Sequence, residues 1–365
     1  MKHLYLIIVS IFLFTACTNN EITIPKTNNT TVANNTTYQE PYRYIKTIPT
    51  YDNEEISDGN FRIAIVFPSK VVGKYGNTTI NSVIGYLLFQ NSKFEIESFD
   101  SENESVDSIY NTLNEVKNKG YKKVIALVTS NSLATINNIS SISNMEVYFP
   151  LISKQESNYN NSSNFIFGAI SYENQMKKLL ELSTGDNAQF YEDSSIGMKL
   201  KNIYENLVPD ILVNQTILQT NNNFKEIVTN EKLKHTNLML NTTIVKSSII
   251  LSQLYAYETQ NGAIMTTQQN FDPLILSLTQ YEDRLNLVFA NSIENTDDRL
   301  TELLNLLDTD VKYNWVNYST LVGVDYLFSR NKNGLIKNKV LNNEVLYNTY
   351  LYYSTEASFK KLELN

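Results

Sequence analysis

The only cysteine of the chain, Cys17, carries the clearest chemical signal in the sequence. It follows a basic start at Lys2, an apolar run over residues 4–14 and two small residues, Thr15 and Ala16. The apolar run is too short to span a bilayer comfortably, and this order of segments is typical of a secretory signal peptide. We therefore expect a signal peptide over residues 1–16, with Cys17 as the first residue after cleavage.

The segment around the expected cut resembles a bacterial lipobox, after which the cysteine is lipidated, with palmitate among the expected acyl chains, and anchors the protein in a membrane. The sequence differs from the usual lipobox pattern at Phe14, a position where Leu is usual. An ordinary signal peptide with an incidental cysteine is the alternative. Because Thr18 rather than Asp follows the cysteine, the common sorting rule implies the outer membrane rather than the inner one. We expect a lipoprotein of the cell envelope that faces the periplasm.

Side chains for metal binding or acid–base catalysis are scarce. Of the two histidines, His3 would leave with the signal peptide, so that only His235 stays in the mature chain. The sequence contains no H-E-x-x-H, no P-loop and no G-x-S-x-G motif, each of which places ligands or nucleophiles at a fixed spacing. We predict no metal, no cofactor and no enzymatic activity.

Composition excludes some partners and sets the source of stability. The chain has 38 acidic and 30 basic residues, a net charge of −8 and no long basic run. We expect no nucleic-acid partner on these grounds, because phosphate contacts need clustered Lys and Arg. A single cysteine allows no intramolecular disulfide, so a packed core must stabilise the fold, and a hydrophobic content of 42% is sufficient for one.

Strand and helix patterns alternate from Phe61 onward, whereas residues 17–60 are polar and rich in Asn and Thr. The polar segment cannot bury enough apolar surface to offset its ordering entropy, and we expect a disordered tether there. Buried-strand runs alternate with helical periodicity up to residue 149, and the pattern starts again at Phe165. This predicts an α/β fold with two doubly wound, parallel-sheet lobes. The expected strands cover residues 62–67, 94–99, 123–128, 146–149, 165–167, 189–191, 211–218, 237–240, 263–265 and 287–290.

Three stretches in this order resemble the type I periplasmic binding proteins, the family of branched-chain amino-acid binding proteins and their non-transport relatives. Residues 63–76 resemble the opening strand and its G-x-Y-x-x-x-G loop, and residues 190–197 resemble a second-lobe strand-to-helix segment. Residues 322–326 resemble a late helix that returns to the first lobe. The resemblance covers about residues 61–330 and implies a ligand between two hinged lobes, at the carboxyl ends of the strands.

The resemblance also implies that the chain crosses between lobes three times, near Tyr159, Asn291 and Tyr313. The first lobe would then comprise about residues 61–158 and 291–312, and the second about residues 159–290 and 313–365. The segment from Tyr347 to Tyr353 alternates like a strand. We interpret it as an edge strand of one sheet, with contact to a partner as the alternative.

Candidate ligand contacts follow from these loops. In the first lobe they are Ser69, Tyr75 and the hydroxyl-rich run Thr129, Ser130 and Asn131, which would face an anion at a helix N-terminus or would simply cap that helix. The loop after Pro68 carries valines where amino-acid-binding members expose backbone amides. In the second lobe, Tyr191 would stack on a ligand. Glu192 would bind an ammonium group or act as a structural cap.

Two functions fit this sequence. One is a lipid-anchored binding protein that captures a small polar solute for uptake or sensing. The other is a protein-interaction lipoprotein on the same fold, such as an activator of a penicillin-binding protein that synthesises peptidoglycan. In both cases the expected partners are a membrane, through the N-terminal lipid, and either a small ligand or a protein of the cell envelope. We expect the folded domain to be monomeric.

Overall fold

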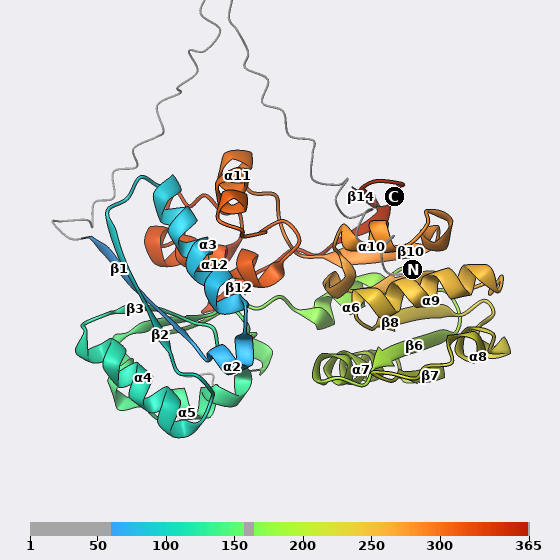
Figure 1. Ribbon diagram of the computed structural model, residues 1–365, viewed down its shortest axis with the longest axis horizontal. Coiled ribbons are helices and arrows are strands. Elements are labelled where there is room, and N and C mark those ends of the chain that lie inside the picture. The colour runs from blue at the N-terminus through green and yellow to red at the C-terminus, as the bar shows by residue number, and fades with distance from the viewer. Residues whose placement is uncertain (1–59, 157–163, 364–365) are drawn as a thin grey trace, which may run out of the picture. The chain divides into compact units, whose positions relative to one another are not determined.

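The computed structural model describes residues 60–156 and 164–363 (Figure 1). The predicted signal peptide, Cys17 and nearly all of the predicted tether lie outside these ranges. The described chain builds two seven-stranded sheets, each mostly parallel and flanked by helices. None of its helices is both long and apolar enough to cross a membrane. The predicted α/β architecture with two sheets is confirmed.

The first sheet has the strand order β11-β12-β5-β4-β3-β1-β2. The five strands from β5 to β2 are parallel, and β11 and β12 form an antiparallel pair at the edge next to β5. The strands are β1 (Phe61–Phe67), β2 (Phe94–Asp100), β3 (Lys123–Ala126), β4 (Glu146–Phe149), β5 (Phe165–Phe167), β11 (Lys339–Leu341) and β12 (Glu344–Leu346).

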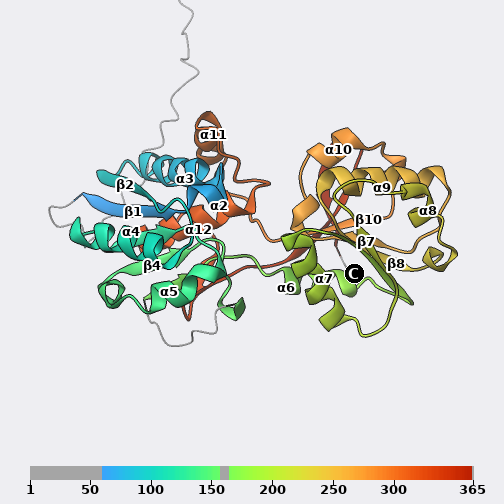
Figure 2. The same cartoon turned by 60° about the horizontal axis from the view of Figure 1, so that its bottom comes forward.

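Helices cover both faces of this sheet, as Figures 1 and 2 show. Alternate residues of β1 enter different cores, with Ile63 and Ile65 on one face and Ala64 and Val66 on the other. This double burial explains why β1 is a nearly continuous apolar run. The helices of this lobe are α2 (Ser69–Val72), α3 (Tyr75–Phe89), α4 (Val106–Asn118), α5 (Leu133–Asn137), α11 (Asp298–Leu306) and α12 (Trp315–Ser329).

The second sheet repeats the plan with the order β14-β13-β10-β9-β8-β6-β7. Its strands are β6 (Asn187–Glu192), β7 (Ile211–Ile217), β8 (Asn237–Asn241), β9 (Ile264–Thr266), β10 (Leu287–Asn291), β13 (Tyr350–Ser354) and β14 (Phe359–Lys361). One core holds residues of α8 (Phe224–Val228), α9 (Ile244–Ala256) and α10 (Leu274–Leu278). The opposite core holds residues of α6 (Tyr172–Leu180) and α7 (Ser195–Leu207).

The sheets place two segments in a different lobe from the one expected. Strand β5 pairs with β4, so the chain stays in the first sheet up to Phe167 instead of leaving it near Tyr159. Helix α12 packs against α3 rather than joining the second sheet at Tyr313. Twelve of the 15 residues of α12 are buried, so neighbouring elements cover this helix on nearly all sides. The last passage between the sheets therefore lies between β12 and β13.

The segment from Tyr347 to Tyr353 is also placed differently from our expectation. Strand β13 pairs with β10 on one side and with β14 on the other, so it is not an edge strand. Tyr347 precedes it and donates a hydrogen bond from its hydroxyl to the carbonyl oxygen of Gly168 at 2.7 Å. This segment is part of the packed protein, and the last strand, β14, forms the edge.

Candidate functional site

In the loop after β1, the backbone N–H of Ser69 already has a hydrogen-bond acceptor within the protein. The backbone N–H of Ser69 donates to Oδ1 of Asp100 at 3.0 Å, and the N–H of Glu102 donates to the same oxygen at 2.7 Å. Burial alone raises the pKa of Asp100, but the hydrogen bonds from Ser69 and Glu102 bring it below its usual value. A carboxylate from the end of β2 thus already occupies the donor that an anionic ligand would need.

The hydroxyl-rich run after β3 is occupied in the same way. Thr129 donates from its backbone N–H and from its Oγ1 to the two carboxylate oxygens of Glu104, each at 2.6 Å. The Oγ1 of Thr129 also accepts from the N–H of Asn131 at 3.4 Å and so caps the short helix that follows. Ser130 and Asn131 are exposed. Thr129 therefore acts as a helix cap, which was the alternative to an anion site, and the carboxylate of Glu104 takes the position that an anion would occupy.

Glu192, at the end of β6, is bound inside the second lobe. Its side chain is 5% exposed and lies 2.6 Å from Nζ of Lys246 on α9. Its second oxygen accepts from the backbone N–H of Thr243 at 2.9 Å. Burial alone raises the pKa of Glu192, but the hydrogen bonds and the charge of Lys246 lower it below its usual value. The ammonium partner expected from a ligand is supplied by the chain itself.

The two candidate tyrosines also contact neighbours within their own lobes. Tyr75, the first residue of α3, is half-buried against an apolar cluster that includes Val72 and Leu127. Tyr191, on β6, accepts a hydrogen bond from the hydroxyl of Thr216 and has Nζ of Lys201 at 5.4 Å from its ring centroid. Neither contact requires a ligand.

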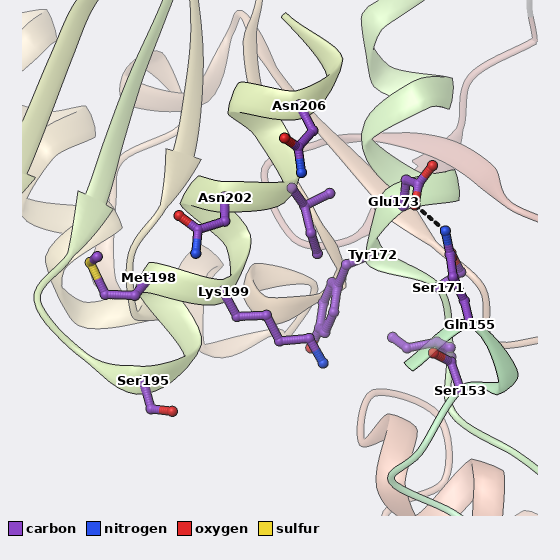
Figure 3. Close-up of a pocket in the computed structure, with 12 residues that line it drawn as sticks. Ser153, Gln155, Ser171, Tyr172, Glu173, Ser195, Met198, Lys199, Asn202 and Asn206 are labelled. Atoms are coloured by element: carbon purple, nitrogen blue, oxygen red, sulfur yellow. Dashed lines mark hydrogen bonds between the residues drawn. The ribbon is translucent and has the colours of Figure 1, made fainter. Parts of the chain in front are cut away.

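A pocket of about 540 Å³, which we call the α7 pocket, is lined by second-lobe residues on α7 and at the start of α6 and by Ser153 and Gln155 of the first-lobe segment between β4 and β5 (Figure 3). This volume is in the range of small-molecule sites. It lies between one face of α7, the start of α6 and the segment that follows β4. Its lining residues are Ser153, Gln155, Ile170, Ser171, Tyr172, Glu173, Ser195, Met198, Lys199, Asn202, Ile203 and Asn206.

Helix α7 presents a polar stripe to this pocket. Its exposed residues Ser195, Lys199, Asn202 and Asn206 follow helical spacing, so they lie on one face, and Figure 3 shows Lys199 beside Tyr172. Helix α7 begins at Ser195, only three residues after the end of β6. Ser194 caps it, since its Oγ accepts from the backbone N–H of Gly197 at 3.1 Å. A Cβ at Gly197 would lie 2.1 Å from the carbonyl oxygen of Glu192, so this close approach requires glycine.

The opposite wall of the α7 pocket is fixed by its own contacts. The ring of Tyr172 meets that of Trp315 edge-on, with centroids 6.4 Å apart. Gln155 donates from Nε2 to Glu173 at 2.7 Å (Figure 3). Hydrogen bonds from Lys177 and Gln155 lower the pKa of Glu173 below its usual value, so this carboxylate stays charged at neutral pH. The pocket therefore combines a held aromatic ring with charged and neutral polar groups.

Buried amides hold α6, and with it Tyr172, in place. Nε2 of Gln175 donates to Oε1 of Gln268 at 3.1 Å and to Oγ of Ser292 at 3.0 Å. In return, the backbone N–H of Gln268 donates to Oε1 of Gln175 at 2.9 Å. All three side chains are buried. This network joins α6 to the carboxyl ends of β9 and β10 and so fixes the helix that starts at Tyr172.

None of the site residues that we predicted from the sequence lines the α7 pocket. Its signal in the sequence was the spacing of Ser195, Lys199, Asn202 and Asn206, which places four polar side chains on one helical face. Tyr172 and the residues around Ser153 come from other elements, and no local pattern connects them to α7. Within the described part of the chain, no group of His, Cys, Asp and Glu side chains is arranged to hold a metal ion.

Comparisons with known proteins identify the fold. No family model and no curated protein matches the chain. Among solved structures, LpoA from Haemophilus influenzae matches 85% of this chain with a TM-score of 0.56 at 13% identity, and 60% of that LpoA chain is covered. This chain thus spans less than two thirds of that LpoA chain.

Two further structures are covered almost entirely. The C-domain of the same LpoA, a regulator of PBP1A, is covered completely by 83% of this chain, with a TM-score of 0.54 at 13% identity. The substrate-binding protein LivJ from Streptococcus pneumoniae, solved with isoleucine, is covered to 99% by 83% of this chain, with a TM-score of 0.57 at 11% identity. Both the regulators and the amino-acid binding proteins share the two-sheet plan described above. The chain therefore has the type I periplasmic binding protein fold.

Proposed function

We propose that this protein is a lipid-anchored binding protein of the bacterial cell envelope that captures a small polar solute in the α7 pocket and catalyses no reaction. The observation that carries the proposal is the polar face of α7 opposite Tyr172, across a space of about 540 Å³. Its structural neighbours are binding or regulatory proteins, in agreement with a binding role.

The lining of the pocket defines the class of solute. Asn202, Asn206 and Gln155 offer amide donors and acceptors, while Tyr172 and Met198 offer apolar surface. Lys199 adds a positive charge and Glu173 a negative one. We expect a compact solute with amide or hydroxyl groups on a partly apolar body, such as a modified amino acid, a short peptide or a cell-wall fragment.

A binding screen with matched variants tests this proposal. Thermal-shift measurements with amino acids, short peptides and muropeptides identify a ligand, and calorimetry gives its Kd. The changes Asn202→Leu and Asn206→Leu should each weaken binding about tenfold or more, because a buried ligand group loses its partner. Asn111→Leu, an exposed asparagine on α4 of the first lobe, is the control. If all three variants bind equally well, the ligand does not lie in the α7 pocket.

The membrane anchor and the location belong to the same proposal. Acylation of Cys17 would hold the domain at the membrane through its lipid chains, and Thr18 at the next position favours the outer membrane. Residues 18–60 would give the domain reach into the periplasm.

A protein-interaction role is the second candidate, and one observation favours it. Asp100 and Glu104 occupy the first-lobe donors of Ser69 and Thr129, where a solute carboxylate would otherwise bind. Such a lobe suits a protein that has kept the fold without the usual ligand, and the C-domain of LpoA, a regulator of PBP1A, is covered completely by this chain. The test is the rate of peptidoglycan synthesis by a purified synthase with and without this protein. A rate increase combined with a negative solute screen would replace our first proposal.

A further inference from the structure

Helix α9 exposes apolar side chains on the side that faces away from its sheet. Ile250, Leu251 and Leu254 are buried in the core of the second lobe. On the outer side, Val245 is 52% exposed and Ile249 is 40% exposed. A helix that is apolar on both sides is usually covered on both sides. The described chain covers only one of them.

The exposed side of α9 continues onto α10, which packs beside it (Figures 1 and 2). Leu274 and Leu278 of α10 are 45% and 42% exposed. A hollow of about 250 Å³ lies between the two helices and is lined by Val245, Ser248, Ile249, Ser252, Gln253 and Leu278. We call this hollow, together with Leu274, the α9–α10 groove.

A second hollow of about 420 Å³ lies further along α9, with Tyr255 and Leu285 in its lining. These two side chains are 53% and 60% exposed. This hollow is also lined by Leu251 and Leu254 of α9, so it adjoins the groove on a neighbouring flank of the helix, next to Tyr255. Exposed apolar surface of this kind, with polar residues at its margin, is typical of a protein interaction site.

The charged residues around the groove are acidic. Glu258 follows α9, Asp272 precedes α10, and Glu282 and Asp283 follow α10 in the chain. Three of these four, all except Asp272, line the hollow of about 420 Å³. Asp283 accepts from Oγ of Ser252 at 2.6 Å, which places its carboxylate next to the groove.

The two basic residues between Ile244 and Asn286 are both engaged inside the protein. Lys246 binds Glu192 and donates to the carbonyl oxygen of Leu218 at 2.7 Å. Arg284 is 2% exposed, and its guanidinium donates to carbonyl oxygens that include those of Thr279 and Thr355. At the far end of α9, Lys225 lies over the ring of Tyr257. The groove thus presents apolar surface and negative charge.

We propose that the α9–α10 groove docks an amphipathic helix of a partner protein whose apolar face is flanked by Lys and Arg. A helix in a groove buries side chains at every third or fourth position, which suits the row of exposed apolar side chains that α9 and α10 present, Val245, Ile249, Leu274 and Leu278. Basic flanks would neutralise Glu258, Glu282 and Asp283. A second copy of this chain is a poor occupant, because a twofold contact would bring the acidic margin against itself. An anionic lipid surface would be repelled for the same reason.

Designed peptides test this proposal on the full chain, independently of any solute. One helical peptide, about 18 residues long, carries Leu at i, i+3, i+4 and i+7 with Lys on both flanks, and its twin carries Glu in place of Lys. Fluorescence anisotropy should show the Lys peptide binding at least tenfold more tightly than the twin. Ile249→Ser and Leu278→Ser should each weaken it at least fivefold. Leu306→Ser, on α11 of the first lobe where Leu306 is 84% exposed, should leave it unchanged.

Several outcomes would overturn the proposal. Equal binding of both peptides would remove the role of the acidic margin, and unchanged binding by Ile249→Ser would place the peptide elsewhere. A dimer seen by sedimentation and lost in Ile249→Ser would make a second copy the occupant. Retention on phosphatidylglycerol vesicles that Ile249→Ser abolishes would make the occupant a lipid surface.

Discussion

Replacing Lys246 by Met should destabilise the protein far more than replacing Lys201 by Met. Both lysines are paired with a glutamate in the second lobe, at 2.6 Å for Lys246 with Glu192 and at 2.7 Å for Lys201 with Glu205. The first pair has side chains that are 13% and 5% exposed, whereas the second has 18% and 34% and spans one turn of α7. The comparison separates the effect of burial from the effect of pairing itself.

The expected magnitudes follow from the two environments. Removing one partner of a buried pair costs about 3–5 kcal/mol, because the remaining charge stays buried without its counter-charge. Lys246 keeps some exposure, so we expect a loss of about 2–4 kcal/mol in the free energy of unfolding. A pair one turn apart on a helix contributes only about 0.3–0.5 kcal/mol, which is the loss expected for Lys201→Met.

The pH dependence gives a second check with a definite sign. In the wild type the pKa of Glu192 lies below its usual value, so this carboxylate contributes stability above the unfolded pKa of about 4.3 and loses that contribution as the pH falls through the folded pKa. In Lys246→Met, burial without a counter-charge raises the pKa of Glu192 instead. The stability difference between wild type and variant should therefore shrink on going from pH 7 towards pH 4.

Urea unfolding at several pH values measures these differences. The double variant Lys246→Met, Glu192→Gln should recover at least half of the loss, because the amide oxygen still accepts from Thr243 and no charge is left buried. The reasoning is refuted if Lys246→Met and Lys201→Met differ by less than about 0.5 kcal/mol. It is also refuted if the deficit of Lys246→Met grows on acidification.

Three further changes test other parts of the structure. In Gly323→Ala the new Cβ would lie 2.4 Å from the ring of Tyr148, so we expect urea unfolding to show a loss of about 1–3 kcal/mol, and any stabilisation would contradict this packing. In Arg284→Gln the carbonyl oxygens around the guanidinium lose their donors, and hydrogen exchange should show β14 losing protection before β6 does, whereas equal protection would contradict this anchoring role. Cys17→Ser should move the protein from the membrane fraction to the soluble fraction without a change in melting temperature, and retention at the membrane would exclude the lipid anchor.

The sequence alone determined the local elements and their repetition. The run from Ile63 to Phe67 is apolar because helices cover both faces of β1, so consecutive side chains are buried on alternate faces. The same local reasoning found the strand–helix alternation and the two-lobed α/β plan, but it started the second lobe at Phe165, and β5 belongs to the first sheet. It also included the structural alternative for Glu192, since an acidic residue at a strand end before a helix is a common cap.

Only the tertiary structure decided which elements share a sheet and which side chains meet. Strand β5 belongs to the first lobe because it pairs with β4, the strand before it in the chain, and helix α12 because it packs against α3, which is far away in the chain. The residues of both elements would fit either lobe. Asp100 binds Ser69, and Glu104 binds Thr129, although the two residues of each pair lie 31 and 25 positions apart in the chain, because parallel pairing aligns the ends of their strands. The α7 pocket joins three separate segments around Tyr172. Periodicity reports the burial of each segment, but the identity of the neighbour that buries it is set by long-range packing.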